Sequence, residues 1–427
     1  MVLILIRCYF CRTLTEAMVN EKRNLIRNRV LKELYFENNL SCADLSTKIH
    51  RSFPVTSGFI EELVKENLII ESGYAPSTGG RRPLTYSVNK DVTYLVSVAM
   101  DQYVTKIAVM DMQNRFVIPV EKILLPLADN TKAVAALLEN LVRVIDSCGI
   151  PKEKIAGVGI GMPGFVNVDK GINYSFLQLP GNESLTDYFS KELGLPVYID
   201  NDSSLIALAE YYFGKARNER NAMVINIGWG IGLGMILNGE LFRGHDGFAG
   251  EFSHIPLFLN GKLCWCGKVG CLETETSLLL MIQSAKEGIE EGRKSRLKHL
   301  PFDDLELAFE GIARAAQEGD QFAAELFSKA GHNIGKGVAV LIHLFNPHKI
   351  ILSGRGSLAG KVWQAPIQQA LNEFCIPRLH QGTDIEVSNL GANAELIGGA
   401  ALVMENYEDP GYFNKKQDIK QIIERLI

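Results

Sequence analysis

The sequence lacks an apolar segment that would cross a membrane. The apolar run at its start, residues 1–6, is far shorter than the roughly 20 residues that a membrane-spanning helix needs. The polar and Arg-containing residues that follow do not form the cleavage region of a signal peptide. We therefore expect a cytoplasmic protein with no membrane partner, and Met18 is an alternative to Met1 as its first residue.

The sequence also has too few cysteines, at too irregular a spacing, for a framework of disulfides. Three of its eight cysteines lie between residues 264 and 271, and the others are Cys8, Cys11, Cys42, Cys148 and Cys375. An odd remainder of this kind is typical of a reducing compartment. The length of 427 residues predicts two or three domains, and a content of 47% hydrophobic and 22% charged residues is typical of a globular protein.

A strong excess of one charge is absent from the whole chain, whose formal net charge is −5, but the two parts of the chain differ. Residues 1–90 hold 13 Lys and Arg against 9 Asp and Glu, a net charge of +4, and the remainder holds 31 against 40, a net charge of −9. A basic front end and an acidic body are compatible with a nucleic-acid-binding head on a body that binds a small molecule.

One stretch of the body has the ligands of a metal site, namely His254, Cys264, Cys266 and Cys271. Thiolates and an imidazole suit tetrahedral Zn²⁺, and four protein ligands leave no open position for a catalytic water. We therefore predict a structural zinc that clamps a loop, so that Glu251 and Glu273 on either side point into a shared pocket together with His254. The alternative is that the cysteines are unrelated reduced thiols.

The head, residues 19–90, has the pattern of a winged helix-turn-helix. Apolar residues recur at helical spacing over residues 21–38, Ser41 is a candidate N-cap for a second helix, and Pro54 would open a third. Two strand-like runs, residues 68–73 and 84–88, then flank a Gly-rich loop that carries two arginines. This order of elements predicts a domain that binds DNA.

Six basic or hydroxyl-bearing residues of this head are predicted to contact DNA. They are Lys48, Arg51, Thr56, Ser57, Arg81 and Arg82. The two wing arginines would meet phosphates or a minor groove, and the two hydroxyl side chains near the front of the third helix would reach base edges. That helix has no positive charge between Arg51 and Lys65. A winged helix used only for protein contacts therefore stays open as an alternative.

The body, residues 92–427, alternates strands and helices, which predicts an α/β fold in two lobes. We place the first lobe at residues 92–204, completed by the C-terminal segment 395–427, and the second lobe, with the zinc site, at residues 205–394. Ligands of such folds bind in the cleft at the strand ends.

Several candidate ligand contacts fall at those strand ends. The Gly-rich turn of residues 159–164, with Gly161, lets the backbone approach a ligand closely, although a plain tight turn would explain it equally. Asn201 and Asp202 end a strand and precede a helix, where they could bond vicinal hydroxyls or simply cap the helix. Glu251, His254 and Glu273 add two carboxylates and an imidazole, and such an acceptor-rich set suits a polyhydroxyl ligand.

These motifs together resemble the ROK family of bacterial repressors and sugar kinases, which are built on the actin-like ATPase, or ribonuclease H-like, fold. The resemblance covers almost the whole chain, from the winged helix to residues 346–347 and 354–356, and the motifs at 247–254 and 264–273 carry it most specifically. It implies sugar contacts at Asn201, Asp202, Glu251, His254 and Glu273. It also implies that Asp202 matches the catalytic base of the kinases and that His254 and the three cysteines match the zinc site of the family.

The loops that hold ATP phosphates in ROK kinases are altered here. The first loop reads Asp-x-Gly-Gly-Thr in those kinases, and the matching residues 101–105 read Asp-Gln-Tyr-Val-Thr. Tyr103 and Val104 cannot adopt positive φ without strain, and their side chains would occupy the space of a phosphate. In the second loop, residues 228–232, Trp229 replaces a small hydroxyl residue. We therefore do not expect ATP and Mg²⁺ as cofactors.

The sequence thus predicts a sugar-responsive transcriptional regulator of carbohydrate metabolism, and specifically a repressor. Its expected partners are a double-stranded DNA operator and a sugar, or a phosphorylated or N-acetylated one. A homodimer or homotetramer is expected because winged helices usually read paired half-sites. One alternative is an ATP-dependent kinase for a hexose or N-acetylhexosamine with Asp202 as catalytic base, and another is a sugar-binding scaffold that acts through protein partners.

Overall fold

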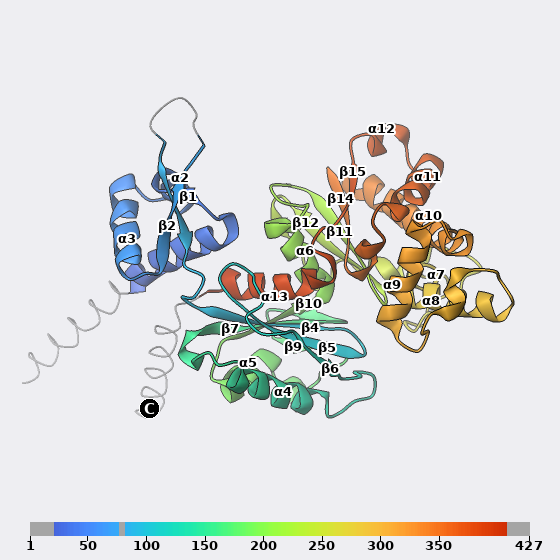
Figure 1. Ribbon diagram of the computed structural model, residues 1–427, viewed down its shortest axis with the longest axis horizontal. Helices are drawn as coiled ribbons and strands as arrows, with labels where there is room; N and C mark the ends of the chain where they lie inside the picture. The colour runs from blue at the N-terminus through green and yellow to red at the C-terminus, as the bar shows by residue number, and fades with distance from the viewer. Residues whose placement is uncertain (1–20, 77–81, 408–427) are drawn as a thin grey trace, which may run out of the picture.

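The computed structural model describes residues 21–76 and 82–407, which form a small N-terminal head and a body with two α/β lobes (Figure 1). Within these ranges the body contains two five-stranded sheets, and the head contains a three-stranded sheet. No helix in the described ranges is both long and apolar enough to cross a membrane.

The head has the elements of a winged helix-turn-helix. A helix over residues 21–37 precedes β1 (Leu40–Ser41), α2 (Cys42–Lys48), α3 (Phe53–Lys65), β2 (Ile69–Tyr74) and β3 (Leu84–Val88). Ser41 caps α2 in a capping box with Asp44, and Pro54 lies in the first turn of α3, where its missing N–H costs no hydrogen bond. Strands β2 and β3 form the wing, and Arg81 between them lies outside the described residues.

The sheet of the first lobe consists of β4 (Tyr94–Met100), β5 (Val104–Met110), β6 (Glu121–Leu124), β7 (Ile155–Met162) and β10 (Val197–Asn201). A short ribbon of β8 (Val166–Asn167) and β9 (Ile172–Asn173) follows β7. Helices α4 (Ala133–Ser147) and α5 (Leu185–Leu193) cover one face of the sheet (Figure 1). They do so because apolar residues such as Leu137, Leu141 and Phe189 share a core with the strands.

The sheet of the second lobe consists of β11 (Ala222–Ile227), β12 (Ile231–Leu237), β13 (Glu240–Leu241), β14 (Lys349–Ser353) and β15 (Asp384–Val387). The helices of this lobe are α7 (Glu273–Thr276), α8 (Leu278–Glu290), α9 (Leu305–Gln317), α10 (Gln321–Phe345), α11 (Gln364–Phe374) and α12 (Pro377–His380). Residues of α8 to α11 share one apolar core with β11, β12 and β14.

The two sheets repeat one topology. Their strand orders are β10-β7-β4-β5-β6 and β13-β12-β11-β14-β15, so in both an antiparallel run of three strands is followed by two strands parallel to the first. This duplicated arrangement confirms the predicted two-lobe, actin-like α/β body behind an N-terminal head.

Two helices form the centre of the body, between the sheets. Helix α13 (Ala394–Glu405) packs on β4 and β7, α6 (Asp202–Phe213) packs on β11 and β12, and the two helices pack on each other. A Cβ atom on Gly398 would lie 2.0 Å from the carbonyl oxygen of Leu205, so glycine is what allows this close approach. The lobe boundary expected between residues 204 and 205 falls inside α6, which packs as one unit.

The head rests on the far ends of these two helices. Phe36 of the head stacks on Tyr212 near the end of α6, with ring centroids 3.8 Å apart. Lys32 donates to the carbonyl oxygen of Glu405 at the end of α13, and Arg217 pairs with Glu37 at 2.9 Å. Helices that begin at the cleft of the body therefore end at the head.

Candidate functional site

A cavity of ≈ 330 Å³ opens between the two lobes. Its walls include residues at the carboxyl ends of β4, β7, β10, β11 and β14, which is where α/β folds place their ligands. One side, here called the sugar half, is formed by Asn201, Asp202, Glu251, His254 and Glu273. The other, here called the phosphate-loop half, is formed by Asp101, Gln102 and residues 228–232 together with Arg355.

At the start of α6, Asn201 caps the helix, whereas Asp202 is a buried carboxylate in the wall of the cavity. The Oδ1 atom of Asn201 accepts from the N–H groups of Ser203 at 2.9 Å and Ser204 at 3.3 Å, and its Nδ2 donates to the carbonyl of Gly164 at 3.2 Å. Asn201 is therefore the helix cap. Burial raises the pKa of Asp202 to about 6, and the charge of Asp101 adds to this rise. A carboxylate with a pKa near neutrality can accept a proton from a hydroxyl group.

The other carboxylates of the sugar half lie on the loop that follows β13 and at the start of α7. Burial raises the pKa of Glu251 to about 7, with Asp202 and Glu273 adding to the rise. The Nε2 atom of His254 lies 3.8 Å from a carboxylate oxygen of Glu251. The indole N–H of Trp265 donates to Glu273 at 3.0 Å, a contact that the sequence analysis missed. Three carboxylates and an imidazole therefore converge on one side of the cavity.

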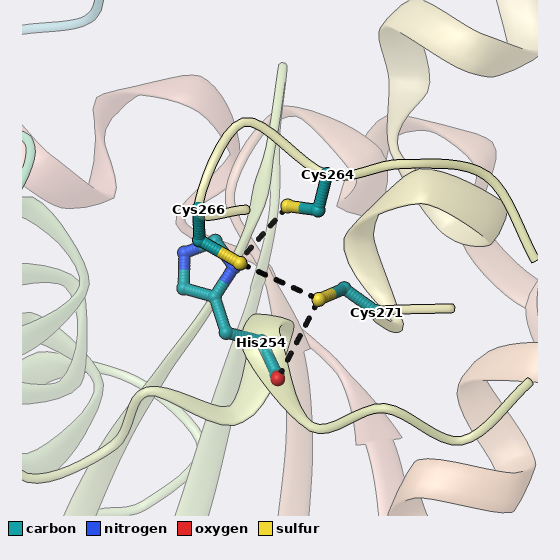
Figure 2. A group of neighbouring side chains, drawn as sticks. All are labelled: His254, Cys264, Cys266 and Cys271. Atoms are coloured by element: carbon teal, nitrogen blue, oxygen red, sulfur yellow. Dashed lines mark hydrogen bonds between the residues drawn. The ribbon is translucent and has the colours of Figure 1, made fainter. Parts of the chain in front are cut away.

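The predicted metal ligands form one cluster. His254 comes from the 3₁₀ turn η3 (Phe252–His254), Cys264 and Cys266 from the next loop, and Cys271 from the residues before α7 (Figure 2). The ligand atoms all lie within 4.8 Å of one another. The sulfur atoms of Cys266 and Cys271 are 3.6 Å apart, and two thiolates on one tetrahedral zinc would be about 3.8 Å apart. The cluster therefore fits a metal ion such as zinc.

The chemistry of the donors agrees with this fit. Burial raises the pKa of the Cys271 thiol to about 12, so a cation is needed to keep its sulfur deprotonated at neutral pH. Gly270 has a φ of +78°, and a Cβ there would lie 1.8 Å from the carbonyl oxygen of Phe258, so glycine alone fits this turn. The Nδ1 atom of His254 is 3.6 Å from the Cys264 sulfur. This leaves Nε2 on the side of Glu251, so one ring can serve both the metal and the cleft.

The phosphate-loop half differs from a glycine loop in its backbone. The Oδ1 atom of Asp101 accepts from the N–H groups of Tyr103 and Val104, each at 2.8 Å, and neither of these residues has a positive φ. The Oδ2 atom of Asp101 accepts from Arg355 at 2.6 Å, and the guanidinium of Arg355 lies 4.8 Å from the ring centroid of Trp229. Asp101 therefore binds both the first loop and Arg355, and Arg355 in turn contacts the indole of Trp229.

Ion pairs extend this contact from lobe to lobe. Glu306 of α9 lies 3.1 Å from Lys106 of β5 and 2.5 Å from Lys122 of β6, and Arg355 lies 3.8 Å from the same glutamate. The lysines lower the pKa of Glu306 to about 2 in spite of its partial burial. Arg355 and Glu306 could not be predicted from local sequence patterns, because their partners lie 254 and 184 residues away along the chain.

Two of the three glycines that remain in the second loop are explained by the side chains packed against them. A Cβ on Gly230 would lie 2.6 Å from a carboxylate oxygen of Glu273, and one on Gly232 would lie 2.0 Å from the hydroxyl of Ser203. These two glycines therefore give room to Glu273 and to the start of α6.

Gly161 departs from its prediction as a sugar contact. It is not among the described residues that line the cavity, and a Cβ there would lie 2.6 Å from Glu395 and 2.9 Å from Leu205. We therefore remove Gly161 from the sugar-contacting set, since its role is to make room for Glu395. That glutamate does line the cavity, and burial raises its pKa well above the usual range. The sequence analysis missed it.

The side chains predicted to contact DNA differ in their exposure. Arg51 and Arg82 are exposed, Ser57 is half-buried, and Lys48 pairs with Glu33 at 3.4 Å and with a second glutamate nearby. The prediction that Thr56 reaches base edges is wrong. Its side chain is 0% exposed, and its hydroxyl donates to the carbonyl oxygen of residue 52.

The comparison with family models agrees with this fold and site. The model of the ROK family matches residues 98–406, which is more than half of the chain. The chain therefore belongs to the ROK family.

The relatives of this chain include both repressors and a kinase. The xylose repressor of Caldicellulosiruptor bescii is 28% identical over 382 residues, which is 88% of this chain and 94% of the repressor. A glucokinase of Halalkalibacterium halodurans is 34% identical over 257 residues, which is 60% of this chain and 78% of the enzyme. Among solved structures, a ROK family transcriptional regulator described as a homologue of the Escherichia coli MLC protein gives a TM-score of 0.72 at 28% identity, over 91% of this chain and 97% of that one.

The extent of these matches is informative. A match over 88% of this chain is longer than the body alone, so the likeness to the xylose repressor reaches into the head. The likeness to the glucokinase covers a shorter part of the chain, although its identity is higher.

Proposed function

We propose that the protein is a sugar-responsive, DNA-binding transcriptional regulator, a repressor of carbohydrate metabolism. The observation that carries this proposal is the contrast within the cavity. The sugar half presents Asp202, Glu251 and Glu273 as hydrogen-bond acceptors, whereas in the phosphate-loop half Asp101 and Arg355 are bonded to each other. A sensor needs the first half alone, and a kinase needs both. The winged helix and the length of the repressor matches support the same proposal.

The charges of the cavity favour an uncharged sugar as the effector. Its walls carry the carboxyl groups of Asp101, Asp202, Glu251, Glu273 and Glu395. Its basic groups are already paired, Arg355 with Asp101 at 2.6 Å and Lys106 with Glu306 at 3.1 Å. A phosphorylated sugar would bring further negative charge into this acidic space, so an uncharged monosaccharide, plain or N-acetylated, is the ligand class we propose.

Helices α6 and α13 supply a route from the cavity to the head. Asp202 and Glu395 lie at their first turns, beside the cavity, and Tyr212 and Glu405 lie at their last turns, beneath the head. The hydroxyl of Tyr212 donates to a carboxylate oxygen of Glu405 at 2.8 Å, and its ring stacks on Phe36. A sugar that draws the lobes together would shift both helices and thereby the surface on which the head rests. Operator affinity changes only as far as the sugar prefers one of the two arrangements.

The metal in this proposal is a structural zinc. His254, Cys264, Cys266 and Cys271 would complete its tetrahedron, which leaves no position for substrate or a reactive water. The ion would hold the loop that carries Trp265 and the start of α7, and with it Glu273. We further propose a homodimer or homotetramer that binds double-stranded operator DNA, since two winged helices are needed to read paired half-sites.

The test uses the full-length protein and the DNA upstream of its own operon. Footprinting and gel-shift titrations are run with no sugar, with a panel of uncharged monosaccharides, and with their phosphates. We expect a protected site and at least one uncharged sugar that changes its affinity. If no site is protected under any of these conditions, the regulator proposal is wrong.

A second candidate is a sugar kinase. It is favoured by Asp202, which lies in the cavity with a pKa raised to about 6, and by the likeness to a glucokinase. An ADP-release assay against hexoses and N-acetylhexosamines tests it. Turnover that Asp202→Asn abolishes would support the kinase, and we expect none above the background of the assay.

A further inference from the structure

The exposed start of helix α3 consists of apolar groups. Phe53 is 56% exposed and Val55 is 43% exposed, and both lie in the first turn with the exposed Pro54. One turn further on, Gly58 is exposed, and apart from its chain neighbours and the backbone of its own helix no atom lies within 4 Å of the place where its Cβ would be. In the described head, this is the end of α3 that a winged helix-turn-helix inserts into the major groove.

The polar side chains of α3 are already engaged. Thr56 is buried, and the hydroxyl of Ser57 donates to Glu61 at 3.2 Å. Further along, Glu62 and Glu66 are both paired with Arg27 from the preceding helix. Among the described side chains of the first two turns, Ser57 is thus the one that could hydrogen-bond a base edge, and donating to a base would break its bond to Glu61.

Positive groups flank this apolar surface. Arg51 precedes the helix, Lys65 is its last residue, and Arg82 lies in the wing loop two residues before β3, and all three are exposed. Such an arrangement suits a surface that anchors on phosphates at its edges while its centre faces the bases. It also argues against a purely apolar protein partner, which would leave these charges buried and unpaired.

We propose that Phe53 and Val55 read the C5-methyl groups of thymines in the major groove of the operator. This inference rests on the proposed function, since it requires sequence-specific DNA binding. Thymine alone among the four bases presents a methyl group in that groove, and a surface without hydrogen-bonding groups can distinguish bases only by such apolar contact. The absence of positive charge from α3 before its last residue, Lys65, is then the expected composition of a helix that reads methyl groups, while Arg51, Lys65 and Arg82 hold the DNA backbone.

The experiment first selects the operator and then removes its methyl groups. Full-length protein enriches sites from a random double-stranded DNA pool, and footprinting defines each half-site. Deoxyuridine then replaces thymidine at single positions, which removes the methyl group and leaves the base pair intact. We expect one or two positions in each half-site where the substitution weakens binding by about fourfold, the value of one buried methyl group.

Variants connect that loss to the two side chains. Phe53→Ala and Val55→Ala should weaken binding to the thymidine operator and reduce the discrimination against deoxyuridine toward onefold at one position each. Val142→Ala is the matched control, because Val142 is 40% exposed on a helix of the first lobe, and it should keep the full discrimination. Arg82→Ala should weaken binding to both DNAs equally and lower the salt dependence by about one unit.

Each outcome decides something. Equal binding of deoxyuridine and thymidine operators overturns the inference and leaves the regulator proposal standing. The same holds if discrimination persists in both Phe53→Ala and Val55→Ala. If selection enriches no sequence at all, the proposed function itself fails and the inference fails with it.

Discussion

The two halves of the cavity differ in how their polar side chains are arranged. In the sugar half, acidic side chains converge on open space, and the metal cluster and the glycines at 230 and 232 position them. In the phosphate-loop half, Asp101 accepts from the backbone N–H groups of Tyr103 and Val104 and pairs with Arg355. On the proposed function, this difference means that the cavity binds a sugar and does not bind a nucleotide. It also shows that the surviving glycines of a phosphate loop need not indicate phosphate binding.

The largest expected effect comes from disrupting the support of the sugar half. Cys271→Ser should remove the metal, release the loop that carries Trp265, and abolish sugar binding, because Glu273 follows directly in α7. Metal content by mass spectrometry and sugar titration by calorimetry measure both effects. Cys375→Ser, a buried cysteine outside the cluster, is the matched control and should retain metal and sugar. Full sugar affinity in metal-free Cys271→Ser would contradict the clamp.

The next effect concerns an acceptor of the sugar half. Above pH 7, where the carboxylate is ionised, Glu251→Gln should weaken sugar binding by roughly 10- to 100-fold, since hydrogen bonds to a charged group contribute about 1.5–3 kcal/mol. The affinity can be followed by calorimetry or by the fluorescence of Trp265, which is 62% exposed beside Glu273. Glu240→Gln, at an exposed carboxylate on β13, should change nothing. An unchanged affinity in Glu251→Gln would remove this residue from the sugar half.

A smaller effect tests the route from the cavity to the head. Tyr212→Leu removes the stack on Phe36 and the hydrogen bond to Glu405, while the residue lies at the opposite end of α6 from Asp202. We expect sugar affinity within about twofold of the wild type and a loss of most of the sugar-induced change in operator affinity, on the order of 1 kcal/mol. Tyr212→Phe keeps the ring and should lose less. A full sugar response in Tyr212→Leu would exclude this route.

The last effect is a pH dependence of sugar binding. Burial raises the pKa of Asp202 to about 6, so above that pH its ionised form is costly in the empty protein and is offset by sugar hydroxyls that donate to it. Sugar affinity should therefore be highest above pH 6 and fall by up to about tenfold per unit below it. Calorimetry from pH 5 to 8 measures the profile, and Asp202→Asn should lower the affinity and remove this component. A profile that is the same in wild type and Asp202→Asn would assign the titration to another group.

Local patterns in the sequence predicted much of this molecule. The spacing of apolar residues, together with Ser41 and Pro54, predicted the helices of the head. The spacing of His254 and the three cysteines predicted the metal cluster. Thr56 could have been recognised as buried, because it lies four and seven residues before Ile60 and Leu63 on one face of α3.

Contacts between distant segments were beyond reach. Arg355 meets Asp101 only once the two lobes are assembled, and Glu395 meets Gly161 only once α13 packs on β7. The periodicity of a local sequence does not predict contacts between residues so far apart. The bond from Trp265 to Glu273 likewise depends on how the metal loop folds.

The most direct test of the central contrast is a pair of calorimetric titrations on one preparation of metal-loaded, full-length protein. One syringe holds an uncharged monosaccharide chosen from the panel, and the other holds a non-hydrolysable ATP analogue with Mg²⁺. We predict saturable binding of the sugar and no binding of the nucleotide up to millimolar concentration, with or without the sugar. Saturable nucleotide binding in the cavity, or its appearance once sugar is bound, would contradict the account.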